Sequence, residues 1–157
     1  MAGVSDATGT GGGGGDSLNG GAGDDFFSIV DSFETVDGGS GTDAVSLSFA
    51  AMTAGVTVDL NIQGTAQNTG QGMDTLIGIE HVSGTPGNDT ITGSAGADRL
   101  LGGTGIDTLT GGAGNDVFAY LTSSESGFGV TKADILTDFT SGQDLIDLSL
   151  IDADTSI

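Results

Sequence analysis

Acidic residues recur at a fixed spacing of nine in this chain, and their carboxylates are the side chains best suited to bind a ligand. Seven keep the register without a break: Glu80, Asp89, Asp98, Asp107, Asp116, Glu125 and Asp134. Four more follow the same spacing near the N-terminus: Asp16, Asp25, Glu34 and Asp43. If folding stacks these carboxylates, they repel one another unless a cation lies between them. Oxygen ligands of this kind favour Ca²⁺ over Mg²⁺, and a chain with one His and no Cys is poorly suited to Zn²⁺.

The residues around each acid form a nine-residue unit, which appears twice in succession as GGTGIDTLT (102–110) and GGAGNDVFA (111–119). Glycines stand at positions one, two and four, the acid at position six and an apolar residue at position eight. Glycine permits the positive φ of a tight turn, and a three-residue strand has one inward side chain. Two units would complete one turn of a flattened helix with two facing parallel sheets. We therefore expect an all-β fold, a right-handed parallel β-roll (a β-helix of nonapeptide repeats) whose thin coils are stable only when stacked.

The two series of acids are out of phase, because Asp43 and Glu80 are 37 residues apart, one more than four units of nine. An irregular segment must therefore separate two blocks of repeats. We expect a flexible lead at 1–10, a first block at 11–46, a connector at 47–83, a second block at 84–119 and a C-terminal cap or export-type region at 120–157.

Three segments outside the regular units also carry a signal. In the connector, Val56, Val58 and Leu60 alternate with polar residues, which predicts a half-buried strand, and 61–73 is predicted to be a polar surface loop. The unit at 29–37 lacks glycines and should keep its strand without a good turn. The short apolar segments 133–139 and 144–151 suit edge strands or a capping turn.

The composition predicts a fold that depends on a counter-ion. The chain has 31 Gly, 22 Asp and Glu, and two basic residues, Arg99 and Lys132, so its net charge is −20. Such a composition favours disorder, yet 36% of the residues are apolar and regularly spaced. The charge disfavours nucleic acid and anionic lipid as partners. No apolar run has membrane-spanning length and the first residues lack a Sec signal peptide, so export would need another route or an upstream segment.

The units resemble a known family. GGTGIDTLT and GGAGNDVFA are similar to the Gly-Gly-x-Gly-x-Asp-x-apolar-x nonapeptide of the repeats-in-toxin (RTX) proteins. VTVDLN, IEHVSGTPGNDTITG, DVFAYLTSSESG and ADILTDFTSGQDLIDLS resemble, in this order, the C-terminal calcium domain of serralysin-type metalloproteases. The resemblance implies several Ca²⁺ ions, secretion into the extracellular space by type I machinery, and a larger parent such as a serralysin-like protease. Serralysin-like domains continue beyond the point that matches Ile157, so the resemblance also implies a fragment.

The resemblance further implies which groups hold each ion. One turn supplies its acid and the carbonyls of its positions two and four. The turn eighteen residues later supplies its acid and the carbonyls of its positions one and three. The first set is Thr85, Gly87 and Asp89 with Gly102, Thr104 and Asp107. The second is Ser94, Gly96 and Asp98 with Gly111, Ala113 and Asp116. The third is Gly21, Gly23 and Asp25 with Gly38, Ser40 and Asp43. Three further sets are weaker. The first joins Gly12, Gly14 and Asp16 with Glu34. The second joins Gly103, Gly105 and Asp107 with Glu125, and the third joins Gly112, Gly114 and Asp116 with Asp134.

No catalytic constellation accompanies these sites, and we do not expect this chain to be an enzyme. His81 is the only histidine, so a His-Glu-x-x-His zinc site cannot form, and no Gly-x-Ser-x-Gly elbow occurs. We expect a structural role for His81 and plain turn roles for Asp24, Asp31 and Asp37. Two other functions remain open: a structural or adhesive surface module, and a module that binds extracellular polysaccharide. An aromatic content of 5% with no Trp disfavours the latter.

Overall fold

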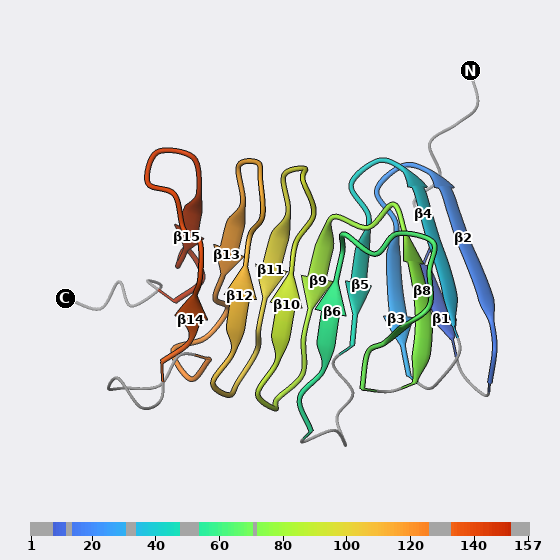
Figure 1. The fold of residues 1–157 in the computed structure, drawn as a ribbon, viewed down its shortest axis with the longest axis horizontal. Helices are drawn as coiled ribbons and strands as arrows, with labels where there is room; N and C mark the ends of the chain where they lie inside the picture. The colour runs from blue at the N-terminus through green and yellow to red at the C-terminus, as the bar shows by residue number, and fades with distance from the viewer. Residues whose placement is uncertain are drawn as a thin grey trace.

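The computed structural model describes residues 8–11, 14–30, 34–47, 54–70, 72–125 and 133–151 of the chain. Short β-strands lie side by side along one long axis, with the N-terminal strands at one end and the C-terminal strands at the other (Figure 1). The described residues contain no helix, and hence no helix able to cross a membrane. Gly12 and Lys132 lie outside the described residues.

One face of the molecule is a continuous parallel sheet of seven strands. Successive strands pair at a spacing of eighteen residues in the regular regions, as Phe26 pairs with Ala44 and His81 with Arg99. The strands are, in spatial order, β1 (Thr8–Gly11), β3 (Phe26–Ile29), β5 (Ala44–Ser46), β9 (His81–Ser83), β11 (Arg99–Leu101), β13 (Val117–Ala119) and β15 (Leu145–Asp147).

The opposite face is split into two sheets of four strands. Their neighbours are parallel except for β7 and β8. The first sheet is β2 (Ser17–Ala22), β4 (Thr35–Ser40), β8 (Met73–Ile77) and β7 (Gln67–Asn68), and the second is β14 (Ile135–Leu136), β12 (Thr108–Thr110), β10 (Thr90–Thr92) and β6 (Thr57–Asp59). The fold is thus an all-β parallel β-roll, as expected.

The inward residue of each strand builds the core. These side chains form one buried cluster between the two faces, because each three-residue strand turns only its middle residue inward. The paired inward residues Leu100 and Phe118 lie under the seven-stranded sheet, and Ile91 and Leu109 lie under the opposite one. The apolar position eight of the repeat is therefore a core position.

The connector has different effects on the strand order of the two faces. On the continuous face β5 pairs directly with β9, because the coil of β8 and β9 stacks on the coil of β4 and β5. Only residues 78–80 separate β8 from β9, whereas a regular turn has six residues. On the other face β6 follows the predicted alternation, with Val58 buried. The predicted loop 61–73 is only partly a loop, since β7 lies within it and pairs with β8. The Gln67 side chain holds the edge of β6: its Oε1 accepts from Asp59 N at 2.8 Å and its Nε2 donates to Asp59 O at 3.0 Å.

The C-terminal segments form the last coil. As predicted, they supply the edge strands β14 and β15. Leu109 pairs with Leu136, 27 residues later, and Phe118 pairs with Ile146, 28 residues later. The spacing of eighteen therefore ends after β13, because the segment between β13 and β14 contains an additional loop.

Candidate metal centre

The acids at position six of the repeat lie at the turn-to-strand junctions, and stacking of the coils puts them in columns. In each column the backbone N–H of one acid donates to the carboxylate of the acid in the next coil. Asp25 N lies 2.8 Å from Asp43 Oδ1, and Asp89 N lies 2.8 Å from Asp107 Oδ1. These four carboxylates are almost completely buried. Buried carboxylates in like-charged columns are costly unless a cation compensates them.

The column beside the continuous sheet contains Asp25, Asp43, Glu80, Asp98, Asp116 and Asp144. Its one exception to the bonding pattern is Glu80, whose N–H donates to Asp43 O at 3.1 Å, so that Asp98 follows Glu80 only through the pairing of His81 with Arg99. The column beside the split face is interrupted at Val56, whose N–H donates to Asp89 Oδ1 at 2.7 Å. Its two parts contain Asp16, Glu34 and Asp74, and Asp89, Asp107 and Asp134.

The structure corrects two of the predicted pairs. Asp107 stacks on Asp134, not on Glu125, and Asp116 stacks on Asp144, not on Asp134. The acids stay in phase by nine after Phe118, but the unit that contains Glu125 lies in the loop, so β12 pairs with a strand 27 residues later and β13 with one 28 residues later. Strand pairing decides which carboxylates meet. The pair Asp16 and Glu34 lies together as predicted, with Asp16 N 3.0 Å from Glu34 Oε2.

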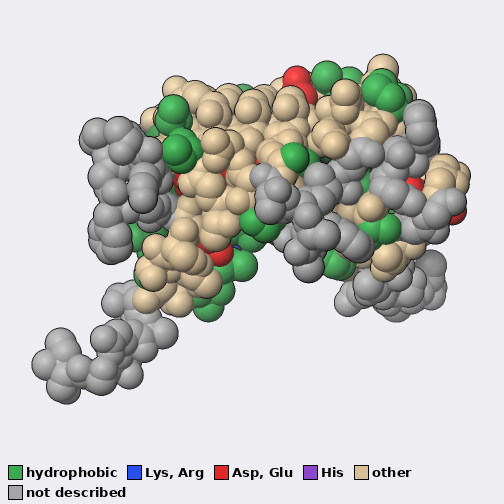
Figure 2. Space-filling view, turned by 90° about the horizontal axis from the view of Figure 1, so that it is seen from below, with side chains coloured by type: hydrophobic (Ala, Val, Ile, Leu, Met, Phe, Trp, Pro, Cys, Tyr) green, Lys and Arg blue, Asp and Glu red, His purple; other side chains and the backbone are tan. Residues whose placement is uncertain are grey.

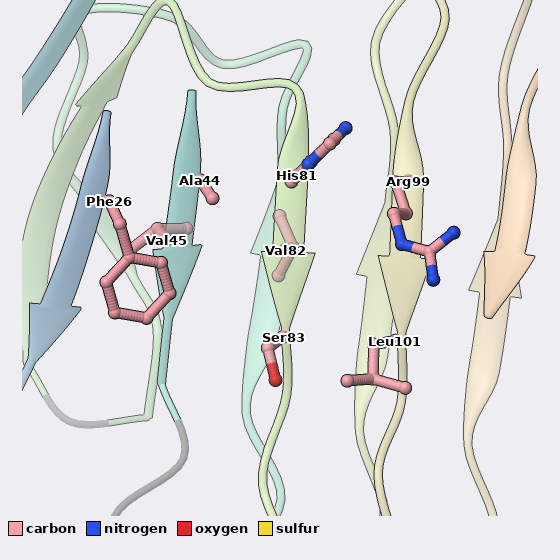
Figure 3. A pocket seen from close by; sticks show the side chains of 8 residues that line it. All are labelled: Phe26, Ala44, Val45, His81, Val82, Ser83, Arg99 and Leu101. Atoms are coloured by element: carbon pink, nitrogen blue, oxygen red, sulfur yellow. The ribbon is translucent and has the colours of Figure 1, made fainter. Parts of the chain in front are cut away.

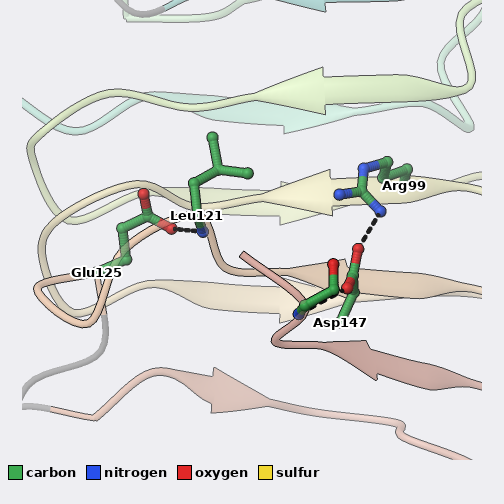
Figure 4. Close-up of polar contacts among 5 residues, drawn as sticks. Arg99, Leu121, Glu125 and Asp147 are labelled. Carbon is green, nitrogen blue, oxygen red and sulfur yellow. Dashed lines mark hydrogen bonds and ion pairs between the residues drawn. The ribbon is translucent and has the colours of Figure 1, made fainter. Parts of the chain in front are cut away.

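Glu125 lies in the loop after β13 and approaches the turns from the side. Its carboxylate is buried, and its Oε2 accepts from Leu121 N at 2.6 Å (Figure 4). It lines a cleft of about 250 Å³ together with Thr85, Gly103 and Thr104. Glu125 is therefore close to the turn of Asp107 without being its stacking partner.

Three acids of this region stand outside the nine-residue register and were not predicted from the sequence. Asp144 ends the acid column, and Asp138 accepts from Gly111 N and Gly112 N, both at 2.8 Å. Asp74 follows Thr69-Gly70-Gln71-Gly72-Met73, which has glycines at positions two and four of a turn. Gly70 and Gly72 have φ of +90° and +149°, close to Gly103 and Gly105 at +96° and +140°. A search for Gly-x-Gly-x-Asp in any phase would have found this turn.

Main-chain oxygens complete the environment of the carboxylates. A Cβ on Gly103 would lie 2.3 Å from Thr85 O, and a Cβ on Gly105 would lie 2.2 Å from Gly87 O. A Cβ on Gly84 would lie 2.6 Å from Gly102 O. Thus three carbonyls of the first predicted set border the gap between the stacked turns that carry Asp89 and Asp107, and only glycine leaves that gap open.

The other two predicted sets have the same construction. In each of the following pairs, a Cβ added to the first residue, a glycine, would lie within 2.6 Å of the carbonyl oxygen of the second residue. The pairs are Gly112 with Ser94, Gly114 with Gly96, Gly93 with Gly111, Gly39 with Gly21, Gly41 with Gly23 and Gly20 with Gly38. Ser40 O accepts from Gly23 N at 2.9 Å, so it also faces the preceding turn. Gly14, from the weaker set, is exposed at φ +95°.

Several carboxylate oxygens at these gaps are buried without a hydrogen-bond partner in the described part of the chain. They are the Oδ2 atoms of Asp43, Asp107, Asp116 and Asp134. Burial, with the charges of Asp134, Asp89 and Glu125, raises the pKa of Asp107 to about 7. Burial and Asp134 also raise the pKa of the nearby Tyr120 hydroxyl. Among the described residues, the region therefore concentrates negative charge without a positive partner.

The donor set fits a hard divalent cation. The groups at each gap are carboxylate and carbonyl oxygens, which are the ligands of Ca²⁺. No three His, Asp or Glu side chains among the described residues gather into a metal cage, so a site must use main-chain oxygens. On the face seen in Figure 2 most of the described surface is backbone or uncharged polar side chains, and little of the acidic side chains shows.

His81 lies away from the columns, on the outer face of the continuous sheet. It lines a shallow hollow with Phe26, Ala44 and Arg99 (Figure 3). Burial and the charge of Arg99 lower the pKa of His81. Arg99 Nη1 pairs with Asp147 Oδ2 at 2.9 Å (Figure 4). No acidic side chain lines this hollow, so it offers Ca²⁺ no carboxylate.

Comparison with known proteins agrees with this geometry. The family model of the RTX calcium-binding nonapeptide repeat matches the chain in four copies, over residues 5–28, 74–109 and 92–119. These segments contain the turns of Asp25, Asp89, Asp98, Asp107 and Asp116. No curated protein matches the chain.

Proposed function

Because this chain carries a module of RTX calcium-binding nonapeptide repeats, we propose that it folds when it binds extracellular Ca²⁺ and thereby supports folding and export of a larger protein. Such repeats are typical of secreted proteins, and the module itself is a structural calcium-binding domain. Export by type I machinery and a serralysin-like protease as the parent are the finer parts of the proposal. The buried Oδ2 atoms without partners carry it, because they need a positive charge in the folded state.

The three predicted ligand sets would hold ions between the turns of Asp25 and Asp43, Asp89 and Asp107, and Asp98 and Asp116. Two further sites would close the second block. One would use the carbonyls of Gly103 and Gly105 with Asp107 and Asp134, and Glu125 lies at its side. The other would use Gly112 and Gly114 with Asp116 and Asp144. The stacking pairs support these sets, and Ca²⁺ would supply the charge that the columns lack.

The energetics are of the right size for a switch. At millimolar Ca²⁺ and a dissociation constant of about 10⁻⁴ M, each ion stabilises the fold by about 1.4 kcal/mol. About four to six ions then contribute about 6–8 kcal/mol, which is comparable to the net stability of a domain. At the low calcium of the cytosol the same columns oppose folding, because their charges repel.

Far-UV circular dichroism of the full chain, titrated with Ca²⁺ from excess chelator to 10 mM with Mg²⁺ as the control, tests the proposal. We expect a cooperative transition from coil to β-structure with Ca²⁺ alone. A chain that is fully folded in chelator, or that responds equally to Mg²⁺, would show that the columns are a scaffold and not a calcium switch.

A further inference from the structure

The four turns of the second block differ at position two. In turns 84–89 and 93–98 this position is Thr85 or Ser94. In turns 102–107 and 111–116 it is Gly103 or Gly112, at φ +96° and +98°. The coil 84–101 therefore has a hydroxyl beside each of its two acids, and the coil 102–119 has none at this position.

Thr85 holds its own turn together through three contacts. Its N–H donates to Asp89 Oδ2 at 2.6 Å, and its hydroxyl donates to Asp89 Oδ1 at 2.8 Å. The same hydroxyl oxygen accepts from Gly87 N at 3.0 Å. One side chain thus fixes the carboxylate and closes the turn. Hydrogen bonds to a charged acceptor are the stronger kind.

Ser94 repeats this arrangement one turn later. Its N–H lies 2.6 Å and its hydroxyl 3.0 Å from Asp98 Oδ2, and its hydroxyl oxygen accepts from Gly96 N at 2.9 Å. Neither Asp89 nor Asp98 has a buried carboxylate oxygen without a partner, in contrast to Asp107 and Asp116 among the described residues.

Both residues also face the next coil. Thr85 O and Ser94 O point at Gly103 and Gly112, since a Cβ on those glycines would lie 2.3 Å and 2.1 Å away. The residue that orders the acid of one coil therefore also presents a carbonyl to the gap where the next coil is added. Ordered ligands bind more tightly, because less conformational entropy is lost on binding.

We propose that Thr85 and Ser94 are positioning residues that order Asp89 and Asp98 before calcium binds, so that coil 84–101 is the preformed side of the two gaps that it shares with coil 102–119 and is the template to which calcium adds that coil. This inference rests on the proposed calcium-dependent folding and adds its order. In the first coil Thr85 and Ser94 donate hydrogen bonds to the carboxylates of Asp89 and Asp98. In coil 102–119 no residue at position two has a hydroxyl, so Asp107 and Asp116 depend on the ion for a partner and this coil folds second.

Hydrogen exchange of the full chain, followed by mass spectrometry at graded free calcium, tests this order. Peptides within 84–101 should gain protection at a lower calcium concentration than peptides within 102–119. The double variant Thr85→Val with Ser94→Ala should raise the calcium midpoints of both coils roughly tenfold, because the two coils share the ions and each altered turn loses a hydrogen bond to a charged group. Thr85→Ser should restore the midpoints for that turn. Thr90→Val, which changes an exposed side chain of the same coil, is the matched control.

Equal midpoints for the two coils in the unaltered chain would overturn the inference, as would a double variant that leaves them unchanged. Both results leave the calcium dependence of folding standing. Protection that does not depend on calcium in either coil would remove the proposed function and this inference together. A Thr85→Ser variant with the defect of Thr85→Val would show that the hydroxyl alone does not order the turn, and would overturn the positioning role.

Discussion

Two kinds of turn carry the acid columns, and they separate two roles of the same carboxylates. Regular turns, such as 102–107, have the glycines whose neighbours present carbonyl oxygens to the gap between coils. Irregular turns, such as 78–80, have an acid with only part of that cradle: a Cβ on Gly38 would lie 2.3 Å from Gly78 O, but this turn has three residues and no further glycine. Glu80 Oε2 nevertheless accepts from Asp43 N at 2.8 Å, as Asp107 Oδ1 accepts from Asp89 N. The hydrogen-bonded column thus belongs to the fold, and the proposed ligand sets belong to the regular turns.

The largest effect should come from Asp107→Ala. Asp107 stacks between Asp89 and Asp134, so its loss should remove two ions and the acceptor for Asp89 N. We expect a loss of about 4 kcal/mol at millimolar calcium, from about 1.4 kcal/mol per ion and one charge-assisted hydrogen bond. Denaturant unfolding measures the stability, and isothermal titration counts the ions. Asp24→Ala, at an exposed acid that also accepts a backbone N–H, is the control. An unchanged ion count in Asp107→Ala would contradict the stacking scheme.

The second effect isolates the close approach of the carbonyl. Gly103 and Gly142 have similar φ, +96° and +90°, but a Cβ on Gly103 meets Thr85 O and a Cβ on Gly142 meets nothing within 4 Å. Gly142→Ala should cost about 1 kcal/mol through the positive φ alone, and Gly103→Ala about 3 kcal/mol because it also crowds the gap. Thermal unfolding in calcium compares them. Equal losses would mean that the gap does not depend on its glycines.

Most of this arrangement could be predicted from the sequence, because glycine and acid positions repeat in the same units that the coils use. The nine-residue spacing of acids, glycines and apolar residues predicted the β-roll and its row of apolar core residues. It failed where register depends on long-range stacking. Leu109 meets Leu136 across 27 residues, and an acid in phase by nine, Glu125, falls in the loop instead. The turn of Asp74 was missed for the converse reason: its local pattern is good, but the length of the connector puts it out of phase with both blocks.

A smaller effect is expected at an irregular turn. Glu80→Ala removes the acceptor of Asp43 N and should cost about 2 kcal/mol without changing the number of calcium ions bound. Glu80→Gln keeps an oxygen acceptor and should recover most of the loss. Asp107→Asn keeps an acceptor in the same way, yet it should still lose ions, because an amide is neutral and Asp107 belongs to a regular turn. Isothermal titration compares the number of calcium ions bound by Glu80→Gln and by Asp107→Asn. If both variants lose the same number of ions, regular and irregular turns do not differ in calcium binding.

The smallest effect concerns pH. The pKa of Asp107 in the metal-free fold is about 7, above its unfolded value, so the stability linked to its proton is complete below about pH 4 and is lost as pH rises through 7. Calcium binding must displace that proton, so the two effects oppose each other. From pH 8 to pH 6 the proton stabilises the metal-free fold by about 1.4 kcal/mol, and neither the unfolded chain nor the calcium-bound fold carries it in this range, so the calcium concentration at the folding midpoint should fall and not rise. Circular dichroism titrations at both pH values measure this change. Asp107→Asn should flatten it and Asp24→Asn should not, whereas an equal pH dependence in all three proteins would place the titrating group outside the regular turn.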